Sequence, residues 1–250
     1  MKKSLVLILA LTLVLAFTAC GGDSDAKSEG VMTHAEYTAA ELESEVVIEA
    51  YVQATQSWWN DQITVYAQDK DGAYFIYNMA CSEEDSKKLV PGTKIKVTGY
   101  KTEWSGEVEI AAGATFEIMD GSYIAKATDV TSLLGTDELI QHQNEFVSFK
   151  GMTVEPYTKD GVAYDVDGVP CAFVYNDDNS GNADSDSDLY FNVSLNGQTY
   201  TFCVEYYLCN NTTDVYKAVQ NLKVGDVVDL EGFLYWYNGA NPHITSVTVK

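Results

Sequence analysis

The aromatic side chains best suited to bind a ligand occur in short groups along the chain. Aromatic faces stack on the C–H faces of sugars and on nucleic-acid bases, and each base stack contributes on the order of 1–3 kcal/mol. The sequence therefore predicts a set of ligand-binding rings: Trp58, Trp59, Trp104, Tyr235, Trp236 and Tyr237. The alternative is that these rings close the ends of a barrel or pack two domains together.

An acidic segment, residues 176–188, has oxygen-bearing side chains at spacings close to those of an EF-hand calcium loop. Counting Asn176 as position one places Asp178, Ser180 and Asp184 near ligand positions, but position twelve is Ser187 in place of the bidentate glutamate. We expect at most weak calcium binding by Asn176, Asp178, Ser180 and Asp184. The alternative is a solvated, mobile insertion, and no other cofactor is expected.

Catalytic motifs are absent from the sequence. It contains no HExxH, Walker, GxSxG or GxGxxG pattern, and its three histidines, His34, His142 and His243, lie about a hundred residues apart. With 37 Asp and Glu residues, a pair of carboxylates could be drawn almost anywhere. We therefore predict no catalytic residues and no enzymatic activity, with an envelope hydrolase using paired carboxylates as the alternative.

The charge balance bears on the ligand. The chain has a net charge of −22, 15 lysines and no arginine, whereas Lys and Arg supply most of the affinity for phosphate backbones. This composition argues against a nucleic-acid partner and favours a non-catalytic binding or scaffold module for a glycan, a peptide or a protein ligand. Nucleic-acid binding stays open as the alternative suggested by fold analogy.

Four cysteines lie beyond residue 20, and none has the CxxC spacing of a zinc site. Cys81 and Cys209 occupy matching places in a repeat described below, which favours small buried side chains over reactive thiols. Cys171 could form a disulfide with Cys203 or Cys209 in an oxidising exterior. The sequence does not choose between these pairings and free thiols.

The first twenty residues are typical of an exported protein. Lys2 and Lys3 precede an apolar run from Leu5 to Phe17 that is too short to span a bilayer. The following Thr18-Ala19-Cys20 resembles the lipobox of bacterial lipoproteins, although Phe17 stands where leucine is usual. The resemblance implies cleavage before Cys20, lipid on that cysteine, and a location at the outer side of a membrane of the bacterial cell envelope. An ordinary cleaved signal peptide is the alternative.

Two stretches of the chain repeat each other at a constant offset of 133 residues. Leu89 to Tyr100 matches Leu222 to Phe233, and the match continues from Trp104-Ser105-Gly106 onto Tyr237-Asn238-Gly239. Such self-similarity indicates a duplicated domain, and two copies do not suggest a solenoid.

Each copy predicts five strands with one helix between the third and the fourth. Alternating apolar residues and turn signals place the strands at 45–53, 63–68, 73–79, 93–100 and 107–110, then 146–154, 189–195, 198–207, 225–233 and 243–249, with helices at 82–89 and 213–222 and leading helices at 33–43 and 136–143.

This order resembles the OB-fold, a five-stranded barrel whose loops between strands one and two and between strands four and five flank a binding face. With its Trp58-Trp59 and Asn78–Asp85 stretches, the chain resembles bacterial lipoproteins with tandem OB-fold-like domains, a resemblance that implies fold and location but no activity. We expect an all-β protein with short helices: a signal peptide (1–19), a flexible tether (20–32), a first barrel (33–125), and a second barrel with the acidic insertion (126–250).

Overall fold

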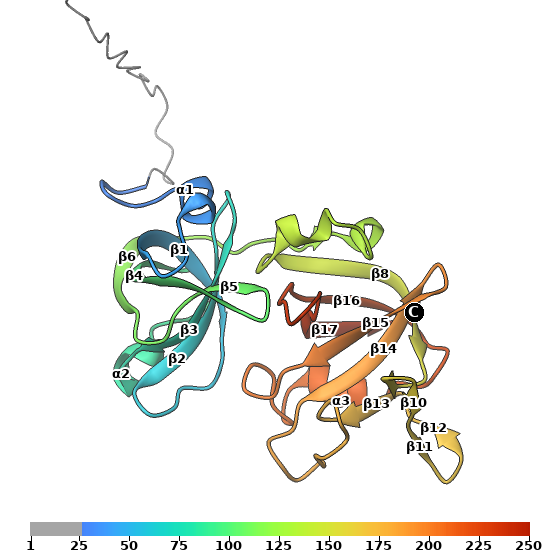
Figure 1. Cartoon of the computed structure of the whole chain (residues 1–250). Coiled ribbons are helices and arrows are strands. Elements are labelled where there is room, and N and C mark those ends of the chain that lie inside the picture. Colours follow the sequence, from blue (N-terminus) through green and yellow to red (C-terminus); the bar gives the residue numbers. More distant parts are fainter. Residues whose placement is uncertain (1–26) are drawn as a thin grey trace, which may run out of the picture.

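The computed structural model describes residues 27–250 and contains two closed five-stranded barrels that lie side by side (Figure 1). Barrel one has the order β1-β2-β3-β5-β4 and closes because β1 also pairs with β4. Its β3–β5 pair is parallel and its other pairs are antiparallel. Its strands are β1 Glu45–Thr55, β2 Gln62–Gln68, β3 Ala73–Ala80, β4 Thr93–Trp104 and β5 Glu107–Ile110.

Barrel two repeats this topology strand for strand, in the order β8-β14-β15-β17-β16. It closes through β8, which pairs with both β14 and β16, and β15–β17 is its parallel pair. Its strands are β8 Phe146–Glu155, β14 Leu189–Leu195, β15 Gln198–Val204, β16 Val227–Phe233 and β17 His243–Val249. The prediction of two tandem OB-fold-like barrels is therefore confirmed.

A short helix follows the third strand of each barrel, as predicted, but both helices are shorter than the sequence indicated. In barrel one α2 spans only Glu83–Ser86, and the Ser82 hydroxyl accepts from the Asp85 N–H at its start. In barrel two α3 spans Asp214–Gln220 and is capped in the same way by Thr213. Only α3 buries side chains in its barrel: Val215, Tyr216 and Val219.

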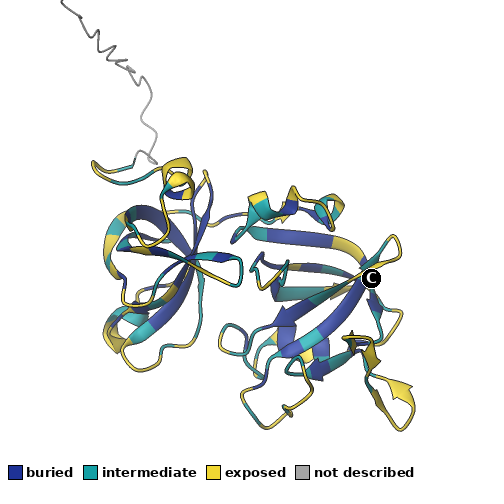
Figure 2. Ribbon diagram, viewed as in Figure 1, coloured by how far each residue is buried: buried dark blue, intermediate teal, exposed yellow. Residues whose placement is uncertain are grey.

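Several elements lie outside the barrels and were not predicted. The longest is β6, Thr115–Ser122, which pairs with β4 and is mostly exposed. The others are short: β7 Thr128–Asp129, β9 Thr158–Lys159, β10 Val162–Ala163, β11 Asp165–Val166, β12 Val169–Pro170 and β13 Phe173–Tyr175. Figure 2 shows the hairpins β9–β10 and β11–β12 on the outside of barrel two.

The leading helices and one predicted loop also differ from expectation. Helix α1 spans His34–Ala39, and the predicted helix over 136–143 is instead a 3₁₀-helix, η2 Leu139–His142, preceded by η1 Thr131–Leu133. The segment 102–104, expected in a loop, continues strand β4 up to Trp104 because Thr102 and Trp104 pair with Glu109 and Glu107. Within residues 27–250, none of the helices has the length and apolar composition needed to cross a membrane.

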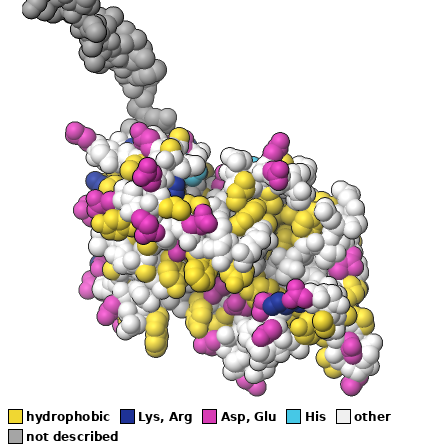
Figure 3. All heavy atoms as spheres, in the orientation of Figure 1, with side chains coloured by type: hydrophobic (Ala, Val, Ile, Leu, Met, Phe, Trp, Pro, Cys, Tyr) yellow, Lys and Arg dark blue, Asp and Glu magenta, His cyan; other side chains and the backbone are white. Residues whose placement is uncertain are grey.

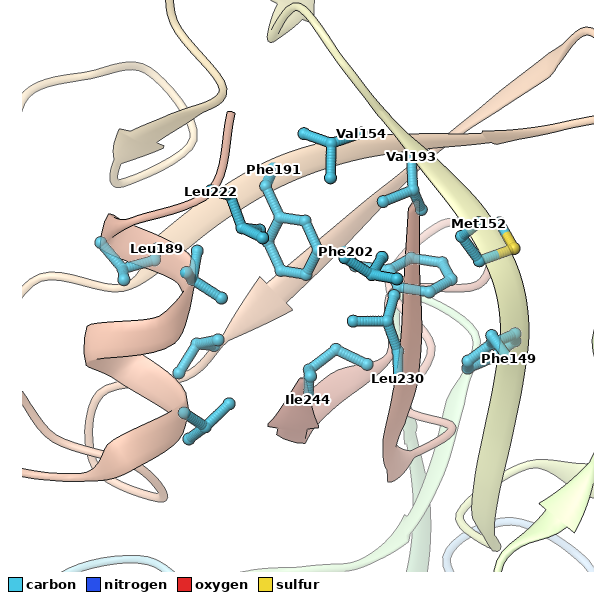
Figure 4. Close-up of a cluster of buried hydrophobic side chains, with 14 of the residues drawn as sticks. Phe149, Met152, Val154, Leu189, Phe191, Val193, Phe202, Leu222, Leu230 and Ile244 are labelled. Carbon is cyan, nitrogen blue, oxygen red and sulfur yellow. The ribbon is translucent and has the colours of Figure 1, made fainter. Parts of the chain in front are cut away.

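Alternating side chains fill the two barrels separately. The core of barrel two includes Phe149, Phe191 and Phe202, all fully buried (Figure 4). The core of barrel one contains smaller residues such as Ala50 and Ala67. Each barrel thus has its own core, as expected for a duplicated domain.

The glycine at the end of each repeated block permits a close approach between strands. A Cβ atom on Gly232 would lie 2.2 Å from the His243 carbonyl oxygen on β17. Gly99 occupies the matching place in barrel one, where a Cβ atom would lie 2.6 Å from Ile110 Cγ2 and 2.8 Å from Ala114 Cβ. Packing therefore requires glycine at this place in both barrels. Gly232 lies against the start of β17, and Gly99 lies against the end of β5.

Candidate functional site

One outer face of barrel one is covered by barrel two. Tyr66 on β2 pairs with Phe75 on β3, and Phe75 pairs with Glu109 on β5, so the three side chains form a row across one face of the sheet. Side chains alternate along a strand, so Tyr77, Glu107 and Trp104 belong to the same face.

Aromatic rings join this face to barrel two. Tyr66 stacks on Phe233 with ring centroids 4.6 Å apart, and Phe75 meets Tyr235 edge-on at 5.2 Å. Tyr235 in turn stacks on His243 at 4.3 Å. The Tyr66 hydroxyl lies 2.7 Å from His243 Nδ1, and burial lowers the pKa of His243 to about 3. The imidazole is therefore neutral, and one hydrogen bond joins its Nδ1 to the Tyr66 hydroxyl.

Hydrogen bonds fix the two barrels at several further points. The Ser57 N–H donates to the Tyr207 carbonyl at 2.8 Å, and the Asn238 N–H donates to the Ser105 carbonyl at 2.7 Å. Glu107 Oε2 accepts from the Trp236 N–H at 2.8 Å. These bonds surround the aromatic junction, so the relative position of the barrels is well defined.

Beside this junction lies a cleft of about 1000 Å³ that both barrels line. Hydrophobic side chains gather on the surface where the barrels meet (Figure 3). Nine of the nineteen residues that line the cleft are aromatic, and side-chain amides and carboxylates make up most of the remainder. The aromatic residues are Trp58, Trp59, Phe75, Tyr77, Trp104, Tyr190, Tyr207, Tyr235 and Tyr237.

The structure brings five of the six predicted ligand-binding rings to this one cleft. Trp59, Trp104 and Tyr237 are 73%, 61% and 49% exposed, so they are available to a ligand. Trp58 is half-buried against the core of barrel one, and its Nε1 donates to the Cys81 carbonyl at 2.8 Å. Tyr235, also half-buried, lies at the junction.

Trp236 is not among the lining residues. Its ring packs against the core of barrel two and approaches Gly106. The alternative of domain packing thus describes Trp236, while Trp58 and Tyr235 both pack and line the cleft.

Three carboxylic acids enter the cleft, and sequence reasoning named none of them. They are Glu109 from β5, Glu205 after β15, and Asp186 from the acidic insertion. Burial raises the pKa of Glu109 to about 7. Burial, with the Asp188 carboxylate as a second cause, also raises the pKa of Glu205 to about 7, although Glu205 accepts backbone hydrogen bonds from Tyr207 and Leu208.

The acidic insertion uses its side-chain oxygens within the loop itself. Asn176 Oδ1 accepts from the Asp188 N–H, and Asp178 Oδ1 accepts from the Ser180 N–H. The Asn176 amide nitrogen, rather than its oxygen, faces Ser180, while Asp184 is exposed and donates its backbone N–H to Asn182. Across residues 27–250 no group of three or more His, Cys, Asp or Glu side chains is arranged to hold a metal ion.

All four cysteines of the described chain are free thiols. Cys81 and Cys209 are buried at matching places after the third strands, and burial raises the pKa of both thiols to about 11. Cys203 is also buried. These thiols are therefore protonated and unreactive at neutral pH. Cys20, the predicted lipidation site, lies outside the described residues.

Comparison with known proteins gives matches of fold only. No protein-family model matches the sequence, and no curated protein matches it. Among solved structures, the chain is similar to a murine DNA-binding protein described as bound with double-stranded DNA (TM-score 0.38, 10% identity, covering 82% of this chain and 96% of that one). It is also similar to the Ifi202 HINa domain described in complex with 20-bp double-stranded DNA (TM-score 0.34, 12% identity, 83% and 98%) and to the tetrameric p202 HIN2 (TM-score 0.32, 12% identity, 84% and 96%).

These matches correct one expectation from the sequence. The composition argued against a nucleic-acid partner, yet two of the matched structures are described as holding double-stranded DNA. At these TM-scores the matches identify no DNA-contacting residue in this chain.

Proposed function

We propose that this chain is a non-enzymatic binding module that holds a ring-bearing ligand, an oligosaccharide in the first instance, in the cleft between its two barrels. The observation that carries the proposal is the convergence of aromatic side chains from both barrels on one cleft. A site of this kind, largely apolar with a few polar groups that fix orientation, is the usual form of a small-ligand site.

The polar lining supports a saccharide. Four side-chain amides, those of Gln56, Gln62, Asn78 and Asn241, lie among the rings. Amides both donate and accept hydrogen bonds, which suits the hydroxyl groups of a sugar. Asn241 Oδ1 is buried and has no hydrogen-bond partner within the described structure, so a ligand hydroxyl would satisfy it.

The test is a titration of the purified chain with neutral oligosaccharides, followed by tryptophan fluorescence and calorimetry. We expect saturable changes in the emission of Trp59 and Trp104. Trp104→Ala should weaken binding at least tenfold, because one stacking face is worth on the order of 1–3 kcal/mol. The matched control is Tyr100→Ala, which removes an exposed ring on the same strand but outside the cleft. Equal losses in both variants, or no saturable change, would refute the proposal.

Nucleic-acid binding is the second candidate, and the barrel topology favours it. The loops and strands of OB-folds bind oligonucleotides as well as oligosaccharides, and the cleft rings are suited to stack on bases. Single-stranded and duplex oligonucleotides belong in the same titration, at low and moderate salt. Affinity that falls steeply with salt would assign the site to a phosphate-bearing ligand.

We also propose that lipid on Cys20 holds the module at the outer side of a bacterial membrane. The support is the sequence before Cys20, with its two lysines, its short apolar run and its small residues. Metabolic labelling with palmitate tests this proposal in living cells. Label should appear in the natural chain and disappear in Cys20→Ala, and label that persists in the variant would refute it.

A further inference from the structure

We infer that the same cleft selects ligands that carry an organic cation, an ammonium group bound against the Glu109 carboxylate. This inference rests on the cleft being the binding site and specifies the class of ligand. It follows from one buried carboxylate, from the rings around it and from the charges that face it.

Glu109 is an unusual carboxylate for its position. It is only 7% exposed and lines the cleft, yet no hydrogen bond or ion pair joins its side chain to any residue from 27 to 250. Other well-buried carboxylates are paired: Glu49 lies 2.9 Å from the Lys94 ammonium, and Glu107 accepts from the Trp236 N–H. A buried carboxyl group without a partner is costly, and a ligand cation would supply the missing partner.

The surrounding charges do not compete with this cation. Glu205 and Asp186 face the cleft from barrel two, and no lysine is among its lining residues. Glu107 lies two residues from Glu109 on the same strand, and because burial raises its pKa to about 8, it is mostly protonated at pH 7 and adds no competing positive charge. The whole chain, at a net charge of −22, also attracts cations over longer distances.

The aromatic rings complete a site that can bind an organic cation. Phe75 is the cross-strand partner of Glu109, and Tyr235 packs edge-on against Phe75. Tyr77 and Trp104 lie on the same face and line the cleft. The faces of such rings attract ammonium groups within about 6 Å, and quaternary ammonium ligands are bound in this way.

Choline and its uncharged analogue 3,3-dimethylbutan-1-ol give a direct test, because they have the same shape and differ in charge. We expect calorimetry on the whole chain at pH 8 to show at least tenfold tighter binding of choline. Equal affinities, or no binding of choline, would overturn the inference. If neutral oligosaccharides bind and choline does not, only the preference for a cationic ligand is overturned. The proposed function then stands.

Two variants assign the effect to Glu109. Glu109→Gln keeps the shape and removes the charge, so choline should bind no better than its analogue, while the affinity for the analogue stays the same. Glu103→Gln, which removes an exposed carboxylate on β4 outside the cleft, should keep the preference for choline. If Glu103→Gln lost the preference for choline and Glu109→Gln kept it, the preference would come from overall charge. If Glu109→Gln does not fold, the choline comparison on the natural chain still decides.

The pH dependence gives an independent measurement. The other titratable groups that line the cleft with Glu109 are five tyrosines, His243 and the barrel-two carboxylates Glu205 and Asp186. Within barrel one, Glu109 interacts electrostatically with Glu107 and Tyr37. Burial raises the pKa of Glu109 to about 7, and a bound cation favours the ionised form of its carboxyl group. Choline affinity should therefore rise between pH 6 and pH 8, by several-fold, and Glu109→Gln should reduce this rise to the part that Glu205, whose pKa is also raised to about 7, contributes. A natural chain without such a rise would contradict the role of Glu109.

Discussion

The two barrels share a topology but fill their cores with different aromatic residues. Barrel two places Phe149, Phe191 and Phe202 in its core. Barrel one packs Tyr37 and Tyr74 beside smaller residues, and both barrels present rings to the cleft, five from barrel one and four from barrel two. The barrels therefore share strand order and a glycine at matching places, while the aromatic residues inside each barrel differ.

The loops between the first and second strands differ just as clearly. In barrel one this loop is six residues long and carries Trp58 and Trp59. In barrel two the same connection runs from residue 156 to residue 188, contains the short hairpins, and contributes Asp186 to the cleft. Corresponding places in the two copies thus supply rings from one side and a carboxylate from the other.

The largest expected effect compares the two matching glycines. Gly232→Ala should destabilise barrel two by on the order of 5 kcal/mol, because its Cβ would overlap a backbone carbonyl that cannot move without breaking β16–β17 pairing. Gly99→Ala should cost about 1–3 kcal/mol, because Ile110 and Ala114 side chains can adjust. Urea unfolding of both variants measures the difference in stability. Equal losses would contradict the distinction between overlap with backbone in barrel two and overlap with side chains in barrel one.

The next effect concerns the junction between the barrels. Tyr66→Ala removes a fully buried ring and should cost about 3–5 kcal/mol. Because Tyr66 stacks on Phe233 across the junction between the barrels, we expect one unfolding transition in the natural chain and two in this variant. Tyr66→Phe keeps the ring, removes the hydrogen bond to His243 Nδ1, and should cost about 1–3 kcal/mol. A calorimetric scan of both variants distinguishes these results, and a single sharp transition in Tyr66→Ala would contradict the coupling.

A smaller effect should appear as a pH dependence of stability. Burial raises the pKa of Glu107 to about 8 in the folded chain, well above the value near 4.3 of an unfolded glutamate. Between these values the folded chain holds a proton that the unfolded chain has lost, so the free energy of unfolding falls as pH rises. We expect a loss of roughly 2 kcal/mol between pH 6.5 and pH 9.

Urea melts at several pH values test this dependence. Glu107→Gln should reduce the slope, leaving the smaller contributions of Glu109 and Glu205, whose pKa values are raised in the same direction. Glu117→Gln, which changes an exposed carboxylate on β6, should leave the slope as it is. A natural chain that gains stability above pH 6.5 would disprove the assignment.

The smallest stability effect separates exposed rings from packed ones. Trp104→Ala should change stability by less than about 0.5 kcal/mol, because the ring is mostly in solvent. Trp58→Ala should cost about 2 kcal/mol, because it removes core contacts and the hydrogen bond to the Cys81 carbonyl. Thermal melts measure both, and a larger loss for Trp104 would place that ring in a packing role.

Elements with strong alternation between clear turn signals could be predicted from the sequence. The bounds of β14 and β17 agree with the prediction: β14 has buried residues on one face and ends at the Asn196-Gly197 turn, and β17 begins directly after Asn241-Pro242. Strand β6 was missed because most of its residues are exposed and its alternation is short, with only Phe116 and Ile118 between polar residues. Helix α2 was predicted too long because it ends in a single turn and buries no side chain.

The site was predictable only where loop position determined it. Trp58, Trp59 and Trp104 were placed by the OB-fold loops, and their rings do line the cleft. Glu107 and Glu109 alternate with Val108 and Ile110, a pattern that indicates a solvent face. That face is covered by barrel two, and no periodicity within a strand contains this information.

The pairing that closes each barrel has a consequence for the order of folding. In barrel one the closing pair begins at Glu45 and Tyr100, whereas in barrel two Phe146 pairs with Phe233 across a longer stretch that includes the insertion. Longer loops cost more entropy to close, and topologies with more distant contacts fold more slowly. Barrel one should therefore form first, and its exposed row of Tyr66 and Phe75 would then offer a ready surface on which Phe233 and the rim of barrel two complete their folding.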